Sequence, residues 1–198
     1  QGVSSAASDV YKRQAKLAKI EEVPPLDEVT LLSADGVAIG TSAKDTVHTT
    51  DTPLHLAFSC HVFDREGRLL VTRRALAKRT WPGVWTNSFC GHPRPGEDMT
   101  DAVHRRAQDE LGLRLTDVSL VLPDYRYRAV DASGIVENEI CPVHVAIADG
   151  PLSPDPDEVA EWAWVDPAEF ADSVIGAPFA FSPWLVEQLP QLRDLGVV

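Results

Sequence analysis

The sequence predicts a mixed α/β fold in a single domain. Its 198 residues suit one domain and leave little room for a second. Short apolar runs alternate with turn signals, and Asp131–Gly134 between two such runs indicates an antiparallel hairpin. Other segments have helical spacing, but strands and helices do not follow the regular alternation of a purely parallel sheet.

The N-terminal segment differs from the rest in composition. Residues 1–28 are rich in small and polar side chains, contain Pro24-Pro25, and lack the apolar core of a secretory signal. We therefore expect a flexible tail or a segment introduced by cloning or translation, and we place the domain at residues 29–198. No apolar run in the sequence approaches the roughly 18 residues that a membrane span needs.

The first half of the domain contains two strand pairs. Val29–Leu32 and Val37–Gly40 flank an Ala-Asp-Gly turn and predict a small hairpin. Leu54–Phe63 alternates, with every second residue from Leu56 to Val62 on one side, so we expect one strand there. A turn then leads into a strand over Arg68–Arg73.

The second half adds helices. Helical spacing over Glu97–Leu111, followed by Gly112, predicts a helix that ends at the glycine. An N-cap serine followed by proline, as in Ser182-Pro183, is a typical start for a final helix. The other predicted elements are strands over Ser119–Val130, Ile135–Ala148 and Ala160–Val165 and a short helix over Pro167–Val174.

The charge balance and the cysteines limit the function classes. Acidic residues outnumber basic ones by 30 to 18, giving a formal net charge of −12, which disfavours nucleic-acid and anionic-membrane partners. The three cysteines are odd in number and widely spaced, which argues against a disulfide framework or a cysteine-rich zinc site. We expect a cytoplasmic protein that is a monomer or a weak homodimer.

The segment Gly91–Leu113 has the spacing of a known motif. Gly91, Glu97, Arg105, Asp109-Glu110 and Gly112 resemble the Nudix box, a loop–helix–loop that holds divalent metal against a diphosphate. The box normally has glutamate at the position of Arg106, so the glutamate cluster for hydrolysis is incomplete, while Glu110 can still hold one diphosphate-bound cation. From the charges alone, the alternative is a solvated helix with ion pairs four residues apart.

Longer stretches narrow the resemblance. They are TWPGVWTNSFCGHP at 80–93, GIVENEICP at 134–142 and FSPW at 181–184. Together with the box they resemble type I isopentenyl-diphosphate isomerase over roughly Val29–Trp184. This resemblance implies a Nudix-like α/β/α sandwich with a mixed sheet, and interconversion of isopentenyl and dimethylallyl diphosphate in isoprenoid biosynthesis. The alternatives are a Nudix-type hydrolase of a nucleoside diphosphate derivative and a non-catalytic metal or diphosphate sensor.

Two glutamates and three histidines form a candidate metal site. Glu137 and Glu139 are two residues apart on a predicted strand, so they share a face and repel unless a proton or cation lies between them. The resemblance assigns His48, His55 and His92, with both glutamates, to a divalent metal. Nitrogen and oxygen ligands suit Mn²⁺, Zn²⁺ or Fe²⁺ better than Mg²⁺.

The resemblance makes Cys90 and Glu139 the two proton-transfer groups. Moving the double bond requires an acid and a base on opposite sides of the substrate, and the tertiary carbocation between them must be kept from water. Aromatic faces favour that positive charge, and Tyr127 and Trp184 are the candidates. Tyr127 is also a candidate hydrogen-bond donor to Glu139.

The diphosphate of such a substrate needs charge compensation in so acidic a chain. The resemblance points to Lys44, Arg74, Lys78 and Arg106 as diphosphate contacts. It also implies Mg²⁺ at Glu110, with the backbone carbonyl of Cys90 as a further ligand. We expect the remaining candidates to be ordinary residues. Cys60 and Cys141 should be small buried hydrophobes, Trp162 and Trp164 should pack in the core, and the other histidines should be surface or core residues: His61, His104 and His144.

Overall fold

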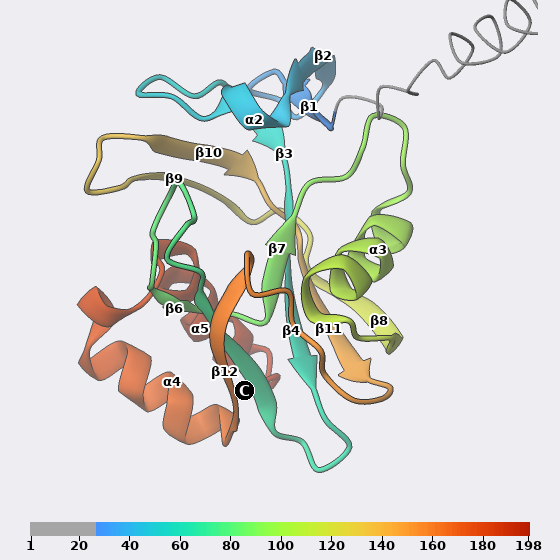
Figure 1. Cartoon of the computed structure of the whole chain (residues 1–198), viewed down its shortest axis with the longest axis vertical. Helices are drawn as coiled ribbons and strands as arrows, with labels where there is room; N and C mark the ends of the chain where they lie inside the picture. The colour runs from blue at the N-terminus through green and yellow to red at the C-terminus, as the bar shows by residue number, and fades with distance from the viewer. Residues whose placement is uncertain (1–26) are drawn as a thin grey trace, which may run out of the picture.

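The strands divide between two sheets, shown in Figure 1 for residues 27–198, the part of the chain that the computed structural model describes. The five-stranded sheet has the order β2 (Ala38–Ala43), β1 (Glu28–Leu32), β3 (His55–Leu56), β10 (Val136–Ile140), β9 (Arg126–Val130). The seven-stranded sheet has the order β12 (Val159–Val165), β5 (Leu69–Arg74), β4 (Phe58–Phe63), β11 (Val143–Ala148), β8 (Leu115–Leu122), with β6 (Trp85–Thr86) beside β5 and β7 (Phe89–Gly91) beside β4. Each sheet contains parallel and antiparallel pairs, so the predicted mixed α/β class is confirmed.

The predicted tail falls almost entirely outside the described residues. Residues 1–26 are not described, whereas Asp27 and Glu28 are, and Glu28 begins β1. The hairpins predicted after Val29 and around Asp131–Gly134 are present as β1–β2 and β9–β10. Gly134 has a φ of 87°, which a glycine adopts without strain.

The helices are α2 (Lys44–Val47), α3 (Met99–Leu111), α4 (Pro167–Gly176) and α5 (Pro183–Asp194), with a 3₁₀ turn at Pro178–Ala180. Helix α3 ends at Gly112 as predicted, but it begins two residues later than predicted because the Asp98 side chain caps it by accepting from the Thr100 and Asp101 amides. Helix α5 follows Ser182-Pro183 as predicted. The Ser182 hydroxyl does not cap it and instead contacts Thr86 Oγ1 at 2.7 Å.

Two apolar clusters pack against opposite faces of the seven-stranded sheet. One joins α3, through residues such as Leu111, to Phe58 and Cys60 of β4. The other joins α4 and α5, through residues such as Leu189, to Val143 of β11. Figure 1 shows α3 on one side of this sheet and α4 and α5 on the other. The order of layers is therefore helix, sheet, helix.

Three predicted strands are each divided. Leu54–Phe63 divides at Ala57 into β3 and β4, and Ile135–Ala148 divides at Cys141-Pro142 into β10 and β11. β3 pairs in parallel with β10 and β4 with β11, so the breaks lie side by side and both chains pass from one sheet to the other. Pro142 lacks the N–H that would continue the ladder. Ser119–Val130 likewise divides, after Leu122, into β8 and β9.

The seven-stranded sheet splits where β4 and β5 diverge. These two strands pair at Phe63 and Leu69, and farther along β4 pairs with β7 while β5 pairs with β6. The split brings Cys90 and the loop that contains Trp81, between β5 and β6, next to the five-stranded sheet. Within residues 27–198, no helix has the length and apolar character required to cross a membrane.

Candidate active site

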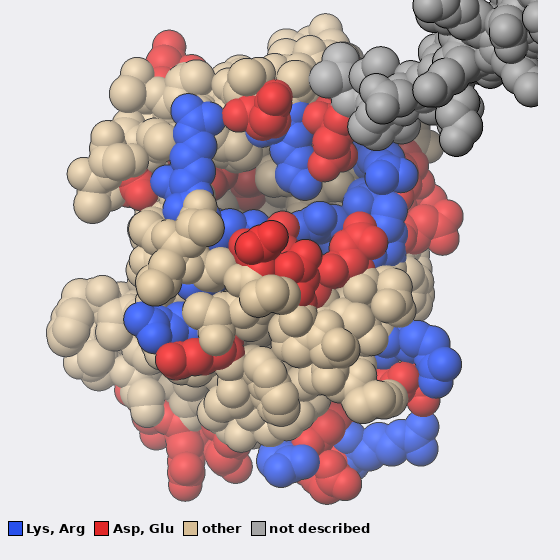
Figure 2. All heavy atoms as spheres, in the orientation of Figure 1, with Lys and Arg blue, Asp and Glu red and all other residues tan. Residues whose placement is uncertain are grey.

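A cavity of about 790 Å³ lies where the two sheets and α3 meet. This volume is in the range of small-molecule sites. Figure 2 shows basic and acidic side chains interleaved around a hollow on this face. The cavity is lined by all of the predicted site residues except His55: Lys44, His48, Arg74, Lys78, Cys90, His92, Arg106, Glu110, Tyr127, Glu137, Glu139 and Trp184.

His48, His55, His92 and Glu139 form a tight group. Each offers one ligand atom, and these atoms all lie within 4.8 Å of one another. His55 and Glu139 are brought together because β3 and β10 pair in register at these two residues. His48 follows α2, and His92 follows β7. Three parts of the sequence, residues 48–55, His92 and Glu139, therefore converge on one point.

The protonation pattern of His55 fits a cation site. Its Nδ1 lies 2.9 Å from the Pro53 carbonyl, which can only accept, so Nδ1 carries a proton. Its Nε2 is buried, forms no hydrogen bond within residues 27–198, and faces Glu139 Oε1 at 3.4 Å. Two acceptors at this separation require a proton or a metal ion between them. The group has the nitrogen and oxygen donors of a divalent-metal site.

The two glutamates of the predicted site differ in position. Glu139 Oε1 also lies 3.1 Å from His92 Nε2. Burial on its own would raise the pKa of the Glu139 carboxyl, but His55 and His92 outweigh it and hold that pKa well below its usual range. Glu137 contacts His48 Nε2 at 2.9 Å and accepts a 2.8 Å hydrogen bond from Thr80, and it is not part of the four-residue group.

Cys90 is held by an asparagine that sequence reasoning missed. Asn87 Nδ2 donates to the carbonyls of Cys60 (3.1 Å) and Phe89 (2.7 Å), which fixes the orientation of the amide and leaves Oδ1 free to accept on its other side. That oxygen accepts from Trp184 Nε1 at 2.9 Å and from Cys90 Sγ at 3.4 Å. Burial raises the pKa of the Cys90 thiol to about 12. Cys90 is therefore a protonated thiol at neutral pH, and its S–H is directed by Asn87.

A series of buried polar side chains, linked by hydrogen bonds, leads from Cys90 into the core. Ser59 Oγ lies 3.3 Å from Cys90 Sγ and accepts a 2.9 Å hydrogen bond from Gln188 Nε2. Gln188 Oε1 lies 2.9 Å from His61 Nε2. Because this oxygen can only accept, His61 must carry its proton on Nε2. His61 is thus a core histidine, as expected, hydrogen-bonded through Nε2, while its buried Nδ1 makes no hydrogen bond within residues 27–198.

His61 provides a pH prediction. Burial lowers its pKa to about 4, whereas an unfolded histidine titrates near 6.5. The unfolded chain therefore binds this proton more readily, and stability that is fully present above pH 6.5 is lost as the pH falls toward 4, by up to about 3 kcal/mol. We expect His61→Gln to flatten the pH dependence of the unfolding free energy in this window, measured by urea unfolding. Equal slopes for His61→Gln and the wild type would contradict the assignment.

Aromatic rings form one wall of the cavity. Tyr127 and Trp184 have ring centroids 5.7 Å apart, and Trp81 meets Trp184 edge-on at 5.4 Å. The Arg74 guanidinium lies 5.5 Å from the Trp184 ring centroid. Tyr127 is paired with Glu139 through the β9–β10 register, but its hydroxyl makes no hydrogen bond to Glu139 within residues 27–198. Burial raises the Tyr127 pKa well above its usual value, so the hydroxyl stays protonated.

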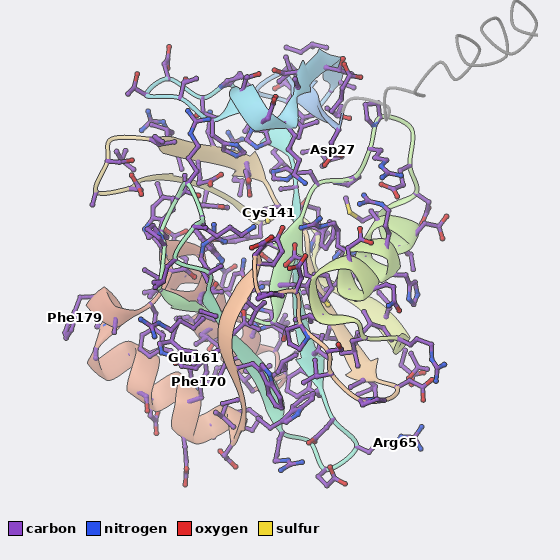
Figure 3. All side chains as sticks on the ribbon, in the orientation of Figure 1. Asp27, Arg65, Cys141, Glu161, Phe170 and Phe179 are labelled. Carbon is purple, nitrogen blue, oxygen red and sulfur yellow. The ribbon has the colours of Figure 1, made fainter. Side chains whose placement is uncertain are left out.

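Most of the residues expected to be ordinary are so. Cys60 and Cys141 are buried, and Figure 3 shows Cys141 near the middle of the molecule. Trp164 packs against the α3 cluster. The expectation of core packing is wrong for Trp162, which is 45% exposed. Trp162 and Trp164 share one face of β12, but of the two only Trp164 packs against the α3 cluster.

Three of the predicted diphosphate contacts are paired with carboxylates, whereas the fourth, Arg74, donates to the Thr80 carbonyl. Lys44 Nζ lies 2.9 Å from Asp27, and Lys78 forms an ion pair with Glu158. Arg106 pairs with Glu110 on the same helix face, as its spacing predicts. Burial raises the Glu110 pKa, against the opposing effect of Arg106.

Comparison with known proteins places this geometry in a family. The NUDIX domain model matches residues 53–185. Curated relatives named isopentenyl-diphosphate Delta-isomerase include proteins from Clavibacter sepedonicus (67% identical, covering 83% of this chain and 86% of the relative), Leifsonia xyli subsp. xyli (60%, 85% and 92%) and Agromyces mediolanus (59%, 92% and 88%). The chain belongs to the isopentenyl-diphosphate Delta-isomerase family. The predicted resemblance is confirmed.

Solved structures confirm the NUDIX fold of this family member. A crystal structure from Deinococcus radiodurans has a TM-score of 0.63 and 17% identity, covering 83% of this chain and 98% of that one. The MutT protein of Methanosarcina mazei has a TM-score of 0.56 and 16% identity, covering 73% and 96%. At these identities the likeness shows the fold alone.

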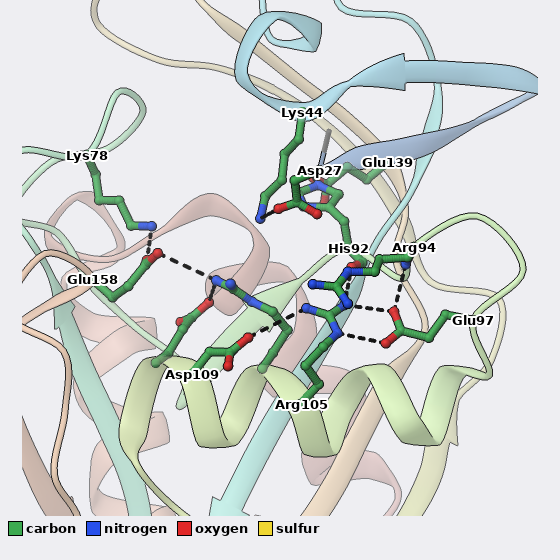
Figure 4. A network of polar contacts seen from close by, with 12 residues as sticks. Asp27, Lys44, Lys78, His92, Arg94, Glu97, Arg105, Asp109, Glu139 and Glu158 are labelled. Atoms are coloured by element: carbon green, nitrogen blue, oxygen red, sulfur yellow. Dashed lines mark hydrogen bonds and ion pairs between the residues drawn. The ribbon is translucent and has the colours of Figure 1, made fainter. Parts of the chain in front are cut away.

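In this isomerase-family chain, some residues of the Nudix box stabilise the structure around α3. Arg105 forms two 2.7 Å hydrogen bonds with Glu97 and donates to the His92 carbonyl at 3.2 Å, which fixes the loop that carries His92 (Figure 4). Asp109 lies 3.7 Å from Arg105 and is exposed. Of the two acids that close the box, Glu110 lines the cavity and Asp109 does not.

Sequence reasoning missed several residues at the site. Thr80 and Asn87 lie within the TWPGVWTNSFCGHP motif at 80–93, so that motif was the sequence signal that could have identified them. Ser59 and Glu158 lie outside every motif, and no local pattern distinguishes them from ordinary residues. Their positions follow from the sheet topology, which brings β4 and the start of β12 to the cavity.

Gly91 tests the packing between β7 and α3. A Cβ on Gly91 would lie 2.7 Å from Arg106 Cγ and 2.8 Å from Phe58 Cζ. We expect Gly91→Ala to lower the free energy of unfolding by about 1–3 kcal/mol through overpacking. Gly40→Ala is the matched control, since a Cβ there meets nothing within 4 Å. Denaturant unfolding of both variants decides the matter, and equal stabilities would contradict the close contact.

Proposed function

We propose that this chain interconverts isopentenyl diphosphate and dimethylallyl diphosphate by protonation and deprotonation. One observation supports this most directly: a thiol, Cys90, and a carboxylate, Glu139, line the same cavity beside aromatic rings. The family relatives, by their names, support the same activity.

Cys90 and Glu139 carry the proton transfers in this proposal. One group protonates the terminal alkene carbon, and the other removes a proton across the allyl unit, with the roles exchanged in the reverse direction. Tyr127 and Trp184 present aromatic faces to the tertiary carbocation between the two steps. The high Cys90 pKa suits a group that holds its proton until the alkene is in place.

A divalent metal at His48, His55, His92, Glu137 and Glu139 fits this chemistry. Mn²⁺ or Zn²⁺ would supply positive charge that orders Glu139 and tunes its acidity. The buried Nε2 atoms of His48 and His55 make no hydrogen bond within residues 27–198 and face the carboxylates of Glu137 and Glu139, which supports metal binding here.

The charged rim suits the diphosphate. Lys44, Arg74, Lys78 and Arg106 all line the cavity and would contact the phosphate oxygens. Glu110, with the Cys90 backbone carbonyl, would hold a Mg²⁺ that neutralises the remaining charge.

Proton NMR of isopentenyl diphosphate with the protein and divalent metal tests the proposal. New methyl signals of dimethylallyl diphosphate are the expected result, with deuterium incorporated when the solvent is D₂O. Released phosphate would instead identify the hydrolase, which the Arg106–Glu110 pair disfavours because it occupies the face where the box glutamates would lie. Line broadening alone would identify a binder without turnover. Either of these outcomes would overturn the isomerase.

A further inference from the structure

Glu158 occupies the position where two predicted diphosphate contacts meet. It directly precedes β12 and lines the cavity. Its carboxylate forms an ion pair with Lys78, as Figure 4 shows. The same carboxylate lies 3.6 Å from Arg106 Nη2. Its backbone is fixed on both sides, because its N–H donates to Asp155 and its carbonyl accepts from Ala75.

This carboxylate is ionised and neutralises both cations. Burial on its own would raise the Glu158 pKa, but Lys78 and Arg106 outweigh it and lower that pKa. Glu110 pairs with the same arginine. Two carboxylates therefore balance two cations, and this part of the rim presents no net positive charge to an anion.

Two consequences follow for an incoming diphosphate. The carboxylate keeps Lys78 and Arg106 extended toward the cavity, where a phosphate oxygen would later take its place. It also repels the diphosphate until a divalent cation screens the acidic groups.

We propose that Glu158 is an internal counter-ion of Lys78 and Arg106 that the diphosphate displaces when it binds. The charge of Glu158 makes diphosphate binding depend on a divalent cation. This inference rests on the proposed diphosphate site but not on the isomerisation chemistry. It assigns Glu158 as a specificity-determining residue for cation-bound over free diphosphate.

Calorimetric titration with inorganic diphosphate, with and without Mg²⁺, tests this role. Removing one negative charge a few ångströms from the anion should make Glu158→Gln bind free diphosphate about tenfold more tightly than the wild type. The gain in affinity that Mg²⁺ gives should shrink by about the same factor, since the two effects are linked. Glu161→Gln is the matched control, because Glu161 lies three residues farther along the chain, in β12, but pairs with Arg73 away from the cavity.

The outcomes separate this role from a structural one. If Glu158 only supports the fold of the rim, Glu158→Gln will bind diphosphate equally or more weakly, which would overturn the proposal. So would a wild type whose diphosphate affinity does not respond to Mg²⁺. Glu158→Ala, which also removes the charge, provides the same comparison if Glu158→Gln does not fold. A protein that passes this test but produces no dimethylallyl signals would refute the isomerase alone.

Discussion

Replacing Cys90 with alanine is expected to slow isomerisation by about 10³-fold or more, because it removes a proton-transfer group. The substitution removes the S–H but leaves Asn87 Oδ1 with the Trp184 and Thr86 hydrogen bonds. The cavity wall should therefore stay in place. We expect kcat to fall while KM changes little, since the thiol is not among the diphosphate contacts. Initial rates from the NMR assay measure both.

Cys60→Ala is the matched control for loss of a buried thiol. Cys60 is fully buried in the α3 cluster and does not line the cavity. This variant should lose stability through the small void but keep a kcat close to that of the wild type at a temperature where it is folded. A Cys90→Ala variant that still incorporates deuterium at near-wild-type rates would remove Cys90 from the mechanism.

The fold was predictable where the local signal and the tertiary structure agree. Gly112 ends α3, and Asp131–Gly134 turns β9 into β10, because glycine in the left-handed region is a requirement of the local backbone. The strand over Leu54–Phe63 could not be divided correctly from its alternation. Its break at Ala57 exists because β3 and β4 join different sheets, which is a property of the partners and not of the segment.

The site was predictable as a set of residues but not as a set of contacts. The motifs identified the three metal-site histidines, Cys90 and Glu139, and the fold places all of them except His55 in the wall of one cavity. Sequence could not show that Pro53 fixes the His55 tautomer or that Thr80 holds Glu137, because these depend on side-chain geometry. It also gave no sign that the predicted diphosphate contacts Lys78 and Arg106 would be neutralised by Glu158.

Replacing Glu139 with glutamine is expected to remove both metal binding and catalysis. Glu139 Oε1 contacts both His55 and His92, so a neutral amide there takes away the carboxylate at the centre of the histidine group. The same substitution removes a proton-transfer group, and we expect a loss of rate of about 10³-fold or more. Elemental analysis after dialysis measures the metal, and the NMR assay measures the rate.

Glu137→Gln separates the two roles of Glu139. Glu137 contacts His48 alone among the three histidines and leaves the four-residue group intact. We expect this variant to bind metal about 10- to 100-fold more weakly, because the four-residue group can still hold the ion, and to recover activity when Mn²⁺ is added in excess. Glu139→Gln should not recover at any metal concentration, because saturating the site does not restore the missing base. Full rescue of Glu139→Gln by metal would mean that Glu139 serves the metal only and that the proton passes through another group.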